Sequence, residues 1–410
     1  MWQALGQNAI KTHRRGTHRP LDPKETLKRV TPHMPAMEIT HIAKVTGLGG
    51  IGIPVVMVCR PNSRSISVSL GKVADLDTAK ASNLMEVVET WHAEHITLPL
   101  KLASFDELRD EHALIDVEHL PHSADSRYRS NLALLWIEGC NLFDDQPLWL
   151  PYELVHTDYR LSQPTGSGCF PANTNGLTSG NHLVEAVAHT LYGVIERDAL
   201  TLTRLAQPLH IKDSLDLVSI DDPACLDLLA RFDQAGLDVR AWDVTSDIDT
   251  TCFERLLIGM NHDDAEPEFD SGCHAVREVA LLKALTEAVH ARTTYIAGSR
   301  DDFSPEIYLV PARALRVRAC RELMTHVCRT QPFESVPSFV SDNLAEDITW
   351  TLKRLRKVGI DQAMVVDLIQ TRFNIPVVQV VVPGLECAFK ERHSDYILGV
   401  LARKIMEAAG

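Results

Sequence analysis

The sequence lacks several features that would each mark a class of protein. It has no run of about 18 or more apolar residues, so no segment predicts a bilayer-spanning helix. Its basic N-terminal region has no apolar segment of the kind that a signal peptide requires. The nine cysteines include no C-x-x-C pair, which argues against a structural zinc site. Their odd number and low density favour reduced thiols in a cytoplasmic protein.

Positive charge is also scarce. The chain has 41 Lys and Arg residues against 55 Asp and Glu residues, a formal net charge of −14. Sequence-independent binding of nucleic acid depends on basic side chains at the phosphates, so this chain is a poor candidate for it. The same charge argues against attraction to an anionic membrane surface. We therefore expect neither nucleic acid nor membrane among the partners.

The sequence does contain enough apolar material for a large core. Its 410 residues are 45% hydrophobic and 23% charged, which predicts two folded domains or one large α/β unit. No internal repeat, low-complexity run or clear linker occurs. We expect a basic N-terminal extension over residues 1–36, a main domain over residues 37–390 and a C-terminal helix over residues 391–410.

Apolar periodicity predicts three long helices over residues 78–94, 182–198 and 276–291. Shorter helices are expected over residues 23–30 (capped by Asp22), 223–235, 345–358 and 394–409. Strands are expected over residues 53–58, 65–70, 132–137, 238–244 and 376–382, and loops over residues 144–151, 166–180 and 298–305. This alternation predicts a mixed α/β fold, with helices packed on mixed β-sheets.

A glycine motif near the N-terminus is open to three interpretations. Gly47, Gly49 and Gly52 match G-x-G-x-x-G, which binds dinucleotides only between a strand and a helix N-terminus. Here the β-branched segment 53–58 follows, so the dinucleotide interpretation fails on context. A tight turn between two strands is the simple alternative. A hairpin that contacts a nucleotide is the other.

Two of the long helices carry acidic residues at helical spacing. Ser82, Glu86 and Glu89 are spaced i, i+4 and i+7, which places them within about 40° of one another on one helix face. Glu185, His189 and Glu196 share a stripe on the second helix, and Arg197 follows directly. The helices could be ordinary amphipathic helices with solvated acidic faces. They could instead hold Mg²⁺ through Glu86, Glu89, Glu185 and Glu196, with ATP supplying phosphate oxygens.

The third long helix adds charged residues near its end. It carries Glu287, His290 and Arg292, and the loop Arg300-Asp301-Asp302 follows. This loop could be a surface turn, or it could place Arg300 on a triphosphate. The residues alone do not separate these two interpretations.

Taken together, these segments resemble the YcaO family from about Gly16 to Leu385. The first helix segment reads Ala79-Lys80-Ala81-Ser82-Asn83-Leu84-Met85-Glu86-Val87-Val88-Glu89. The second segment comprises residues Thr174 to Asn181, before the second helix, and Glu185 and Ile195-Glu196-Arg197-Asp198 on it. The third segment runs from Ala284 to Arg292 and on to Asp302. Three separated helices matching in order are more specific than any one motif.

The resemblance implies an enzyme with a YcaO-type fold around a central ATP and Mg²⁺ site. It implies that a peptide backbone amide is activated by ATP-dependent O-phosphorylation. Metal ligands would be Glu86, Glu89, Glu185 and Glu196, and the residues acting in catalysis would be Glu196, Arg197 and Arg300. Contacts to ATP would come from Lys44, Ser82, Glu185, His189, Arg197, Arg292 and Arg300.

Two positions depart from the family pattern. Thr90 stands where the family often has arginine, and Gly193 stands where the second helix usually carries a further glutamate. One metal-site carboxylate would then be missing, which leaves the number of Mg²⁺ ions open.

The chain most resembles the family branch that acts with a TfuA partner and installs thioamides. Its last proline is Pro383, whereas azoline-forming members typically end in a proline-rich tail. The resemblance thus implies a peptide or protein substrate, a TfuA-like or separate leader-binding partner, and a homodimer. Alternatives are an azoline-forming cyclodehydratase and a non-catalytic ATP-binding accessory factor.

Overall fold

The computed structural model forms two compact units, which are described separately. Unit 1 comprises Met1–Thr12, Val88–Ala206 and Ser341–Gly410, and unit 2 comprises His13–Val87 and Gln207–Val340. The structure describes residues 9–14, 17–48, 50–72, 75–161, 163–206, 209–259, 266–298, 305–326, 328–387, 396–397, 402–404 and 407. Arg300, Asp301, Asp302 and Gly49 lie outside the described residues.

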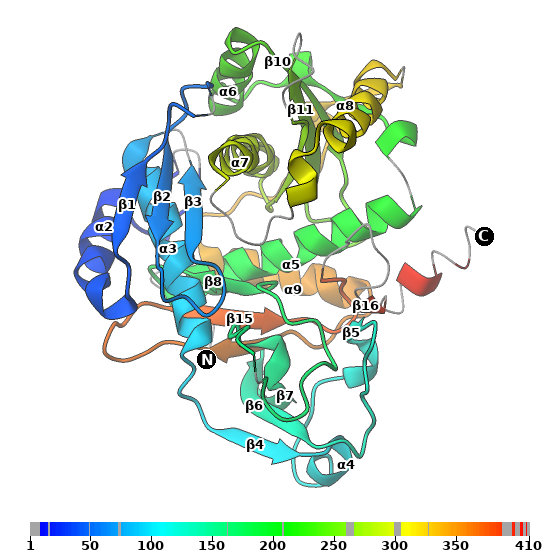
Figure 1. Cartoon of the computed structure of the whole chain (residues 1–410). Helices are drawn as coiled ribbons and strands as arrows, with labels where there is room; N and C mark the ends of the chain where they lie inside the picture. The colour runs from blue at the N-terminus through cyan, green and yellow to red at the C-terminus, as the bar shows by residue number, and fades with distance from the viewer. Residues whose placement is uncertain are drawn as a thin grey trace. The chain divides into compact units, whose positions relative to one another are not determined.

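Unit 1 is built on a six-stranded sheet with the order β4-β6-β14-β15-β8, and β7 pairs with β6 (Figure 1). Helix α5 packs on β8 and β15 and also contacts α9. The strands of this sheet are β4 (Leu100–Ala103), β6 (Leu134–Asn141), β7 (Pro147–Pro151), β8 (Leu177–Ser179), β14 (Met364–Asp367) and β15 (Val377–Val381). A separate two-stranded sheet pairs β5 (His122–Ser123) with β16 (Tyr396–Ile397). The helices are α4 (Phe105–Leu108), α5 (Leu183–Ala206) and α9 (Leu344–Lys357).

Unit 2 places one helix between two sheets. Helix α7 (Arg277–Ala297) contacts a three-stranded sheet on one side and a five-stranded sheet on the other (Figure 1). The first sheet has β1 (His41–Lys44), β2 (Val55–Cys59) and β3 (Val68–Lys72). The second has β9 (Ser214–Asp216), β10 (Leu237–Asp243), β11 (Cys252–Gly259), β12 (Glu268–Cys273) and β13 (Thr330–Pro332). The remaining helices are α2 (Pro23–Val30), α6 (Pro223–Gln234) and α8 (Val310–Thr325), and α3 (Leu76–Glu94) crosses the boundary between the units.

Close packing of α7 on β12 depends on a glycine. A Cβ atom at Gly272 would lie 2.3 Å from the carbonyl oxygen of Ala280 and 2.5 Å from the nitrogen of Ala284. Buried aliphatic side chains of α7, including Leu281 and Leu285, then join the core of unit 2. Burial of these side chains is the main stabilising contribution to the packing of this helix.

The mixed α/β prediction is confirmed, with some differences in the elements. All three predicted long helices form. Helices α5 and α7 extend beyond their predicted C-terminal ends. The loop predicted over residues 144–151 contains β7, because Trp149 and Leu150 pair with β6 despite the flanking prolines. The C-terminal helix predicted from residue 394 is wrong at its start, since β16 pairs there with β5.

The glycine motif joins two strands, as its context predicts. Strands β1 and β2 pair antiparallel, with His41 opposite Cys59 and Lys44 opposite Val56. No helix follows the motif, so the dinucleotide interpretation is wrong. The prediction of one main domain over residues 37–390 stays a prediction. None of the described helices has the length and apolarity of a membrane span.

Candidate functional site

Helix α3 is positioned by a buried asparagine. Within unit 2, the Asn83 side chain donates hydrogen bonds to the carbonyl oxygens of Val56 (2.8 Å) and Ser69 (3.0 Å). Gly71 makes this possible, since a Cβ there would lie 2.3 Å from the Cβ of Asn83. The helix is thus seated on β2 and β3. Of its predicted functional residues, Ser82 is exposed and Glu86 is half-buried.

Glu89, one turn beyond Glu86 on α3, is held by the end of strand β8. Its carboxylate accepts hydrogen bonds from the backbone N–H and the hydroxyl of Ser179, both at 2.8 Å. Charge-assisted hydrogen bonds of this kind fix the orientation of a carboxylate. They also stabilise its charged form.

Glu185, in the first turn of α5, is held by the same segment. Its side chain is 0% exposed and accepts a hydrogen bond from the backbone N–H of Asn181 at 2.6 Å. Gly180 allows the close approach, because a Cβ there would lie 2.8 Å from both the nitrogen of Ala186 and the carbonyl oxygen of His182. A carboxylate at a helix N-terminus is also favoured by the helix dipole.

The structure therefore brings two of the predicted metal ligands to one place. The Glu89 carboxylate accepts a hydrogen bond from Ser179. The Glu185 carboxylate accepts one from Asn181, which follows Ser179 by two residues. Sequence analysis did not identify Ser179 or Asn181 as carboxylate partners. The only available signal was their position in a loop rich in Gly, Ser and Asn.

The remainder of α5 carries the other predicted residues of unit 1. His189, Glu196 and Arg197 are all half-buried. Among the described residues, the Arg197 guanidinium forms no hydrogen bond or ion pair, so its donors are available to an anion. At Gly193, where the resemblance implies a glutamate, a Cβ would meet no atom within 4 Å. The helix therefore has room for a side chain at that position.

Tyr159 is a residue near Arg197 that sequence analysis missed. Burial and, to a smaller extent, the negative charge of the buried Glu94 together raise the pKa of its phenol to about 12, while Arg197 opposes this shift. The phenol therefore stays protonated at neutral pH and can donate a hydrogen bond.

The predicted residues of unit 2 lie on separate elements. Lys44 is an exposed residue of β1, and Arg292 is a half-buried residue of α7. Strand β12 presents the buried Glu268 close to Arg292 and to the fully buried Arg255. Burial raises the pKa of Glu268 to about 8, while the positive charges of Arg255 and Arg292 act against this shift.

The donor chemistry of unit 1 fits a hard cation. Within the ranges described above, no three His, Cys, Asp or Glu side chains are close enough to hold a metal ion on their own. Magnesium commonly binds one or two carboxylates and completes its coordination with phosphate oxygens and water. The oriented carboxylates of Glu89 and Glu185 match that requirement if a polyphosphate binds with the ion.

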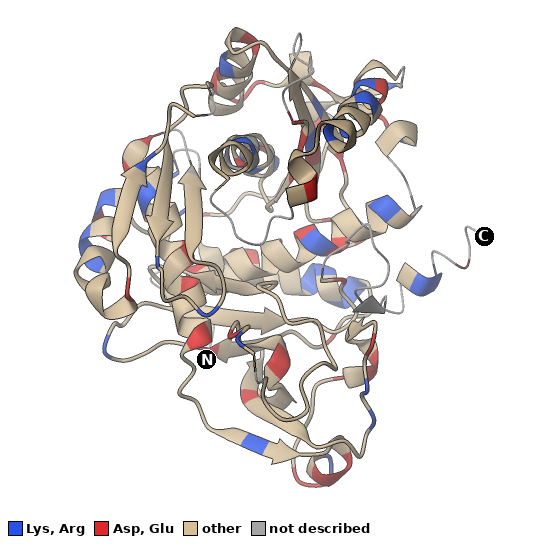
Figure 2. Cartoon of the chain, viewed as in Figure 1, with Lys and Arg blue, Asp and Glu red and all other residues tan. Residues whose placement is uncertain are grey.

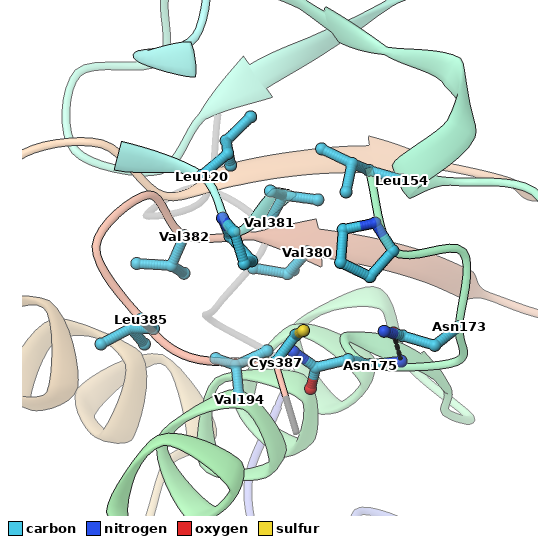
Figure 3. A pocket seen from close by; sticks show the side chains of 12 residues that line it. Leu120, Leu154, Asn173, Asn175, Val194, Val380, Val381, Val382, Leu385 and Cys387 are labelled. Atoms are coloured by element: carbon cyan, nitrogen blue, oxygen red, sulfur yellow. Dashed lines mark hydrogen bonds between the residues drawn. The ribbon is translucent and has the colours of Figure 1, made fainter. Parts of the chain in front are cut away.

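A small cavity in unit 1 does not serve as a nucleotide site. It lies beside α5 and β15 and is lined by apolar side chains such as Val194, Val380 and Leu385 (Figure 3). Its volume of about 40 Å³ has room for little more than a water molecule. The cavity is therefore a packing feature next to α5.

Two relatives match this chain over most of its length. A protein from Rhizobium leguminosarum bv. trifolii, described as lying in the tfuA 3' region, is 35% identical over 377 residues, 90% of this chain and 88% of that protein. An uncharacterized protein from Methanothermobacter thermautotrophicus is 32% identical over 378 residues, 89% of this chain and 94% of that protein.

Two solved structures share the fold. One is YcaO from Methanopyrus kandleri bound with AMPPCP and Mg²⁺, with a TM-score of 0.73 and 20% identity, covering 92% of this chain and 95% of that chain. The other is a heterocyclase in complex with substrate and cofactor, with a TM-score of 0.76 and 20% identity. It covers 96% of this chain, which spans 56% of the heterocyclase chain.

A family model described as YcaO cyclodehydratase, binding ATP and Mg²⁺, matches residues 70–386. This match includes both acidic helices, the whole of β8 and helix α7. The chain belongs to the YcaO family, whose cofactors are ATP and Mg²⁺.

Proposed function

We propose that this protein activates a peptide backbone amide by ATP- and Mg²⁺-dependent O-phosphorylation, leading to a thioamide, together with a TfuA-like partner. Two findings support the proposal. The family model is that of an ATP- and Mg²⁺-binding cyclodehydratase. A relative with 35% identity is named for its position beside tfuA.

The observation that carries the proposal is the pair of carboxylates at the end of β8. Glu89 and Glu185 come from different helices and are both oriented by the segment that contains Ser179 and Asn181. Carboxylates fixed in this way need no rearrangement before a cation binds. An amphipathic helix with a solvated acidic face would not need such buried anchoring.

In the proposed site, each residue of this chain has a role in binding or orienting. Glu86, Glu89, Glu185 and Glu196 would supply the metal ligands, no more than two of them at any one ion in the described arrangement, and the bound metal would neutralise charge on the triphosphate. Arg197 donates hydrogen bonds to a phosphate oxygen, and Glu196 and Arg300 act beside it in catalysis. Ser82, His189, Lys44 and Arg292 contact ATP.

The proposed reaction balances without an oxidant. The amide oxygen attacks the γ-phosphorus of ATP, which releases ADP. A sulfide nucleophile adds to the amide carbon, and the oxygen then leaves with the phosphoryl group as inorganic phosphate. The product is a thioamide, and catalysis comes from positioning and charge neutralisation.

Azoline formation is the second candidate, because the matching family model is described as a cyclodehydratase. In that reaction a substrate cysteine or serine side chain supplies the nucleophile, and water is lost. A non-catalytic ATP-binding accessory role is the third candidate. Gly193, at a position where the family carries a carboxylate, favours it.

Mass spectrometry of a modified peptide tests the proposal. The chain is incubated with a TfuA-like protein, a candidate peptide, ATP, Mg²⁺ and sulfide. A mass gain equal to the exchange of oxygen for sulfur is expected, and Glu185→Gln should abolish it. Loss of one water instead would establish the azoline alternative. Failure of every tested peptide to stimulate ATP hydrolysis, with ATP binding intact, would favour the accessory role.

We further propose that the protein is a cytoplasmic homodimer. All nine cysteines are free thiols, which suits a reducing compartment. Sedimentation velocity should show a dimer, and a monomer at all accessible concentrations would contradict this part of the proposal.

A further inference from the structure

Strand β4 lies at one end of the six-stranded sheet of unit 1 (Figure 1). It pairs with β6 from Leu100, opposite Ile137, to Ala103, opposite Leu134. In the part of the chain that the structure describes, no strand pairs with its other edge. An open edge presents backbone N–H and C=O groups that can pair with an added strand.

The exposed side chains of this edge are apolar. Leu98, Leu100 and Leu102, which alternate along the chain, are 36%, 39% and 57% exposed. Proteins usually protect a sheet edge with charged side chains. The one charged residue of β4, Lys101, pairs with Trp136 and so lies on the sheet face that carries Glu138 and Trp149. Its ammonium is 4.9 Å from the centre of the Trp149 ring and 2.5 Å from Nε2 of His112.

A pocket of about 340 Å³ adjoins this edge. Residues alternate between the faces of a sheet, and the register places Glu138, Trp149 and Asp367 on the same face. The pocket has an apolar lining and a set of carboxylates. The apolar side chains are Leu98, Pro99, Pro147, Trp149, Leu183 and Val365, and the carboxylates are those of Glu138, Asp145 and Asp367.

The charge of the pocket calls for a cation. Among the described residues, three carboxylates and no Lys or Arg line it, and Lys101 adds one positive charge at its rim, over the Trp149 ring. Burial raises the pKa of Asp367, although the backbone N–H of Ile369 donates to its carboxylate and acts against the shift. A partly desolvated carboxylate is stabilised by an incoming cation. The acidic residues of α4, next to β4 (Figure 2), already have partners, since Asp106 pairs with Arg109 at 3.5 Å and Glu107 accepts hydrogen bonds from Ser104.

We propose that β4 and this pocket form a docking surface for an extended polypeptide segment with alternating apolar and basic side chains. The segment adds a strand along the open edge of β4. Its apolar side chains cover Leu100 and Leu102, and a lysine or arginine enters the pocket beside Glu138 and Asp367. The proposal stands on this geometry alone and does not depend on the proposed function.

Fluorescence anisotropy with a labelled Lys-Leu-Lys-Leu-Lys-Leu-Lys peptide tests the proposal at about 0.15 M salt, where long-range attraction is screened. The full chain should bind it saturably. The matched Glu-Leu peptide should not bind. A Lys-Leu peptide with alternate backbone nitrogens methylated should bind at least tenfold more weakly, about 1.4 kcal/mol, because it cannot pair with β4.

Two matched triple variants locate the site. Glu138→Gln, Asp145→Asn and Asp367→Asn together should weaken binding of the Lys-Leu peptide at least tenfold. The control removes three carboxylates elsewhere, through Asp221→Asn, Asp233→Asn and Glu334→Gln, all exposed residues of unit 2. The control should bind like the wild type, and hydrogen exchange should slow at β4 when peptide binds.

Three results would overturn the proposal. The first is a wild-type chain that does not bind the Lys-Leu peptide. The second is equal weakening by both triple variants, which would reveal non-specific attraction to an acidic protein. The third is a dimer that Leu100→Lys with Leu102→Lys dissociates, which would show that a second copy of the chain occupies the surface.

Discussion

At the end of β8 in unit 1, the carboxylates of Glu89 and Glu185 accept hydrogen bonds from backbone amides. At the start of β12 in unit 2, the oxygens of Glu268 have no hydrogen-bond partner of ordinary geometry among the described residues. The first pair is held in orientation by its donors. Burial favours the protonated form of Glu268, whose pKa is about 8. The two regions therefore differ in what acts on their carboxylates: close backbone and hydroxyl donors orient the first pair, whereas burial is the largest effect at Glu268.

The difference between the two regions bears on which carboxylates can bind Mg²⁺. A charged, oriented carboxylate binds Mg²⁺ without first losing a proton. A protonated carboxyl group beside two arginines does not. The proposed metal site therefore uses carboxylates of α3 and α5, and Glu268 is not among its proposed ligands.

The largest expected effect is the loss of turnover in Glu185→Gln. The substitution keeps the size of the side chain and removes the charge that the metal requires. We expect turnover of ATP with peptide to fall about 100-fold or more. The measurement is steady-state phosphate release with the partner protein present. Glu118→Gln, an exposed carboxylate on another element, is the control and should match the wild type. Equal rates for both variants would contradict the assignment.

The next largest effect is a loss of stability when a side chain is added at a closely packed glycine, and it differs between the two regions. Gly272→Ala would force α7 away from β12, and we expect the free energy of unfolding to fall by about 3 kcal/mol. Gly180→Ala should destabilise less, because its nearest contact is 2.8 Å rather than 2.3 Å. It should nevertheless weaken ATP binding, since it displaces the segment that orients Glu89 and Glu185. Urea unfolding and calorimetry measure the two quantities. Binding unchanged in folded Gly180→Ala would contradict the role of that segment.

A third prediction concerns the pH dependence of stability. The folded-state pKa of Glu268 is above its ordinary value of 4.5, so its contribution is full below about pH 4.5 and is lost as the pH rises through about 8. Glu268→Gln should remove this loss, on the order of 5 kcal/mol. Urea unfolding between about pH 5 and pH 9 measures it. Glu334→Gln should keep the wild-type slope. A Glu268→Gln variant that keeps the slope as well would show that Glu268 is not its source.

The smallest effect is expected at Gly193. A Cβ there meets no atom within 4 Å, so Gly193→Ala should stabilise α5 by about 1 kcal/mol. Gly193→Glu restores the carboxylate of the family pattern and should tighten Mg²⁺-dependent ATP binding beyond any change seen with alanine. Thermal unfolding and calorimetry measure the two effects. If alanine and glutamate change binding equally, Gly193 does not stand at a ligand position.

Local sequence was sufficient to predict the helices that carry the site, but strand β8 lies inside the loop predicted over residues 166–180, so that part of the prediction is wrong. Helix α3 lies within two residues of its predicted bounds, because apolar periodicity is a local property. The Asp22 cap of α2 is confirmed, since the Asp22 side chain accepts a hydrogen bond from the backbone N–H of Lys24. Strand β7 was missed because its prolines indicated a loop, while its pairing with β6 decides the conformation.

The contacts within the site could not be predicted in the same way. Glu89 and Ser179 are 90 residues apart in sequence, and their contact depends on how α3 and β8 pack. Nothing in the spacing of Glu86 and Glu89 indicates which strand end will meet them. The charged state of Glu268 likewise depends on burial beside Arg255 and Arg292. Arg300 lies outside the described residues, so its role stays a prediction.

Calorimetric titration of ATP, with and without Mg²⁺, tests the central claim most directly. The wild type and Glu118→Gln should bind ATP saturably only when Mg²⁺ is present. Glu89→Gln should bind at least tenfold more weakly, about 1.4 kcal/mol. Equal affinity of the wild type and Glu89→Gln, or no Mg²⁺-dependent binding by the folded wild type, would contradict the proposed carboxylate site.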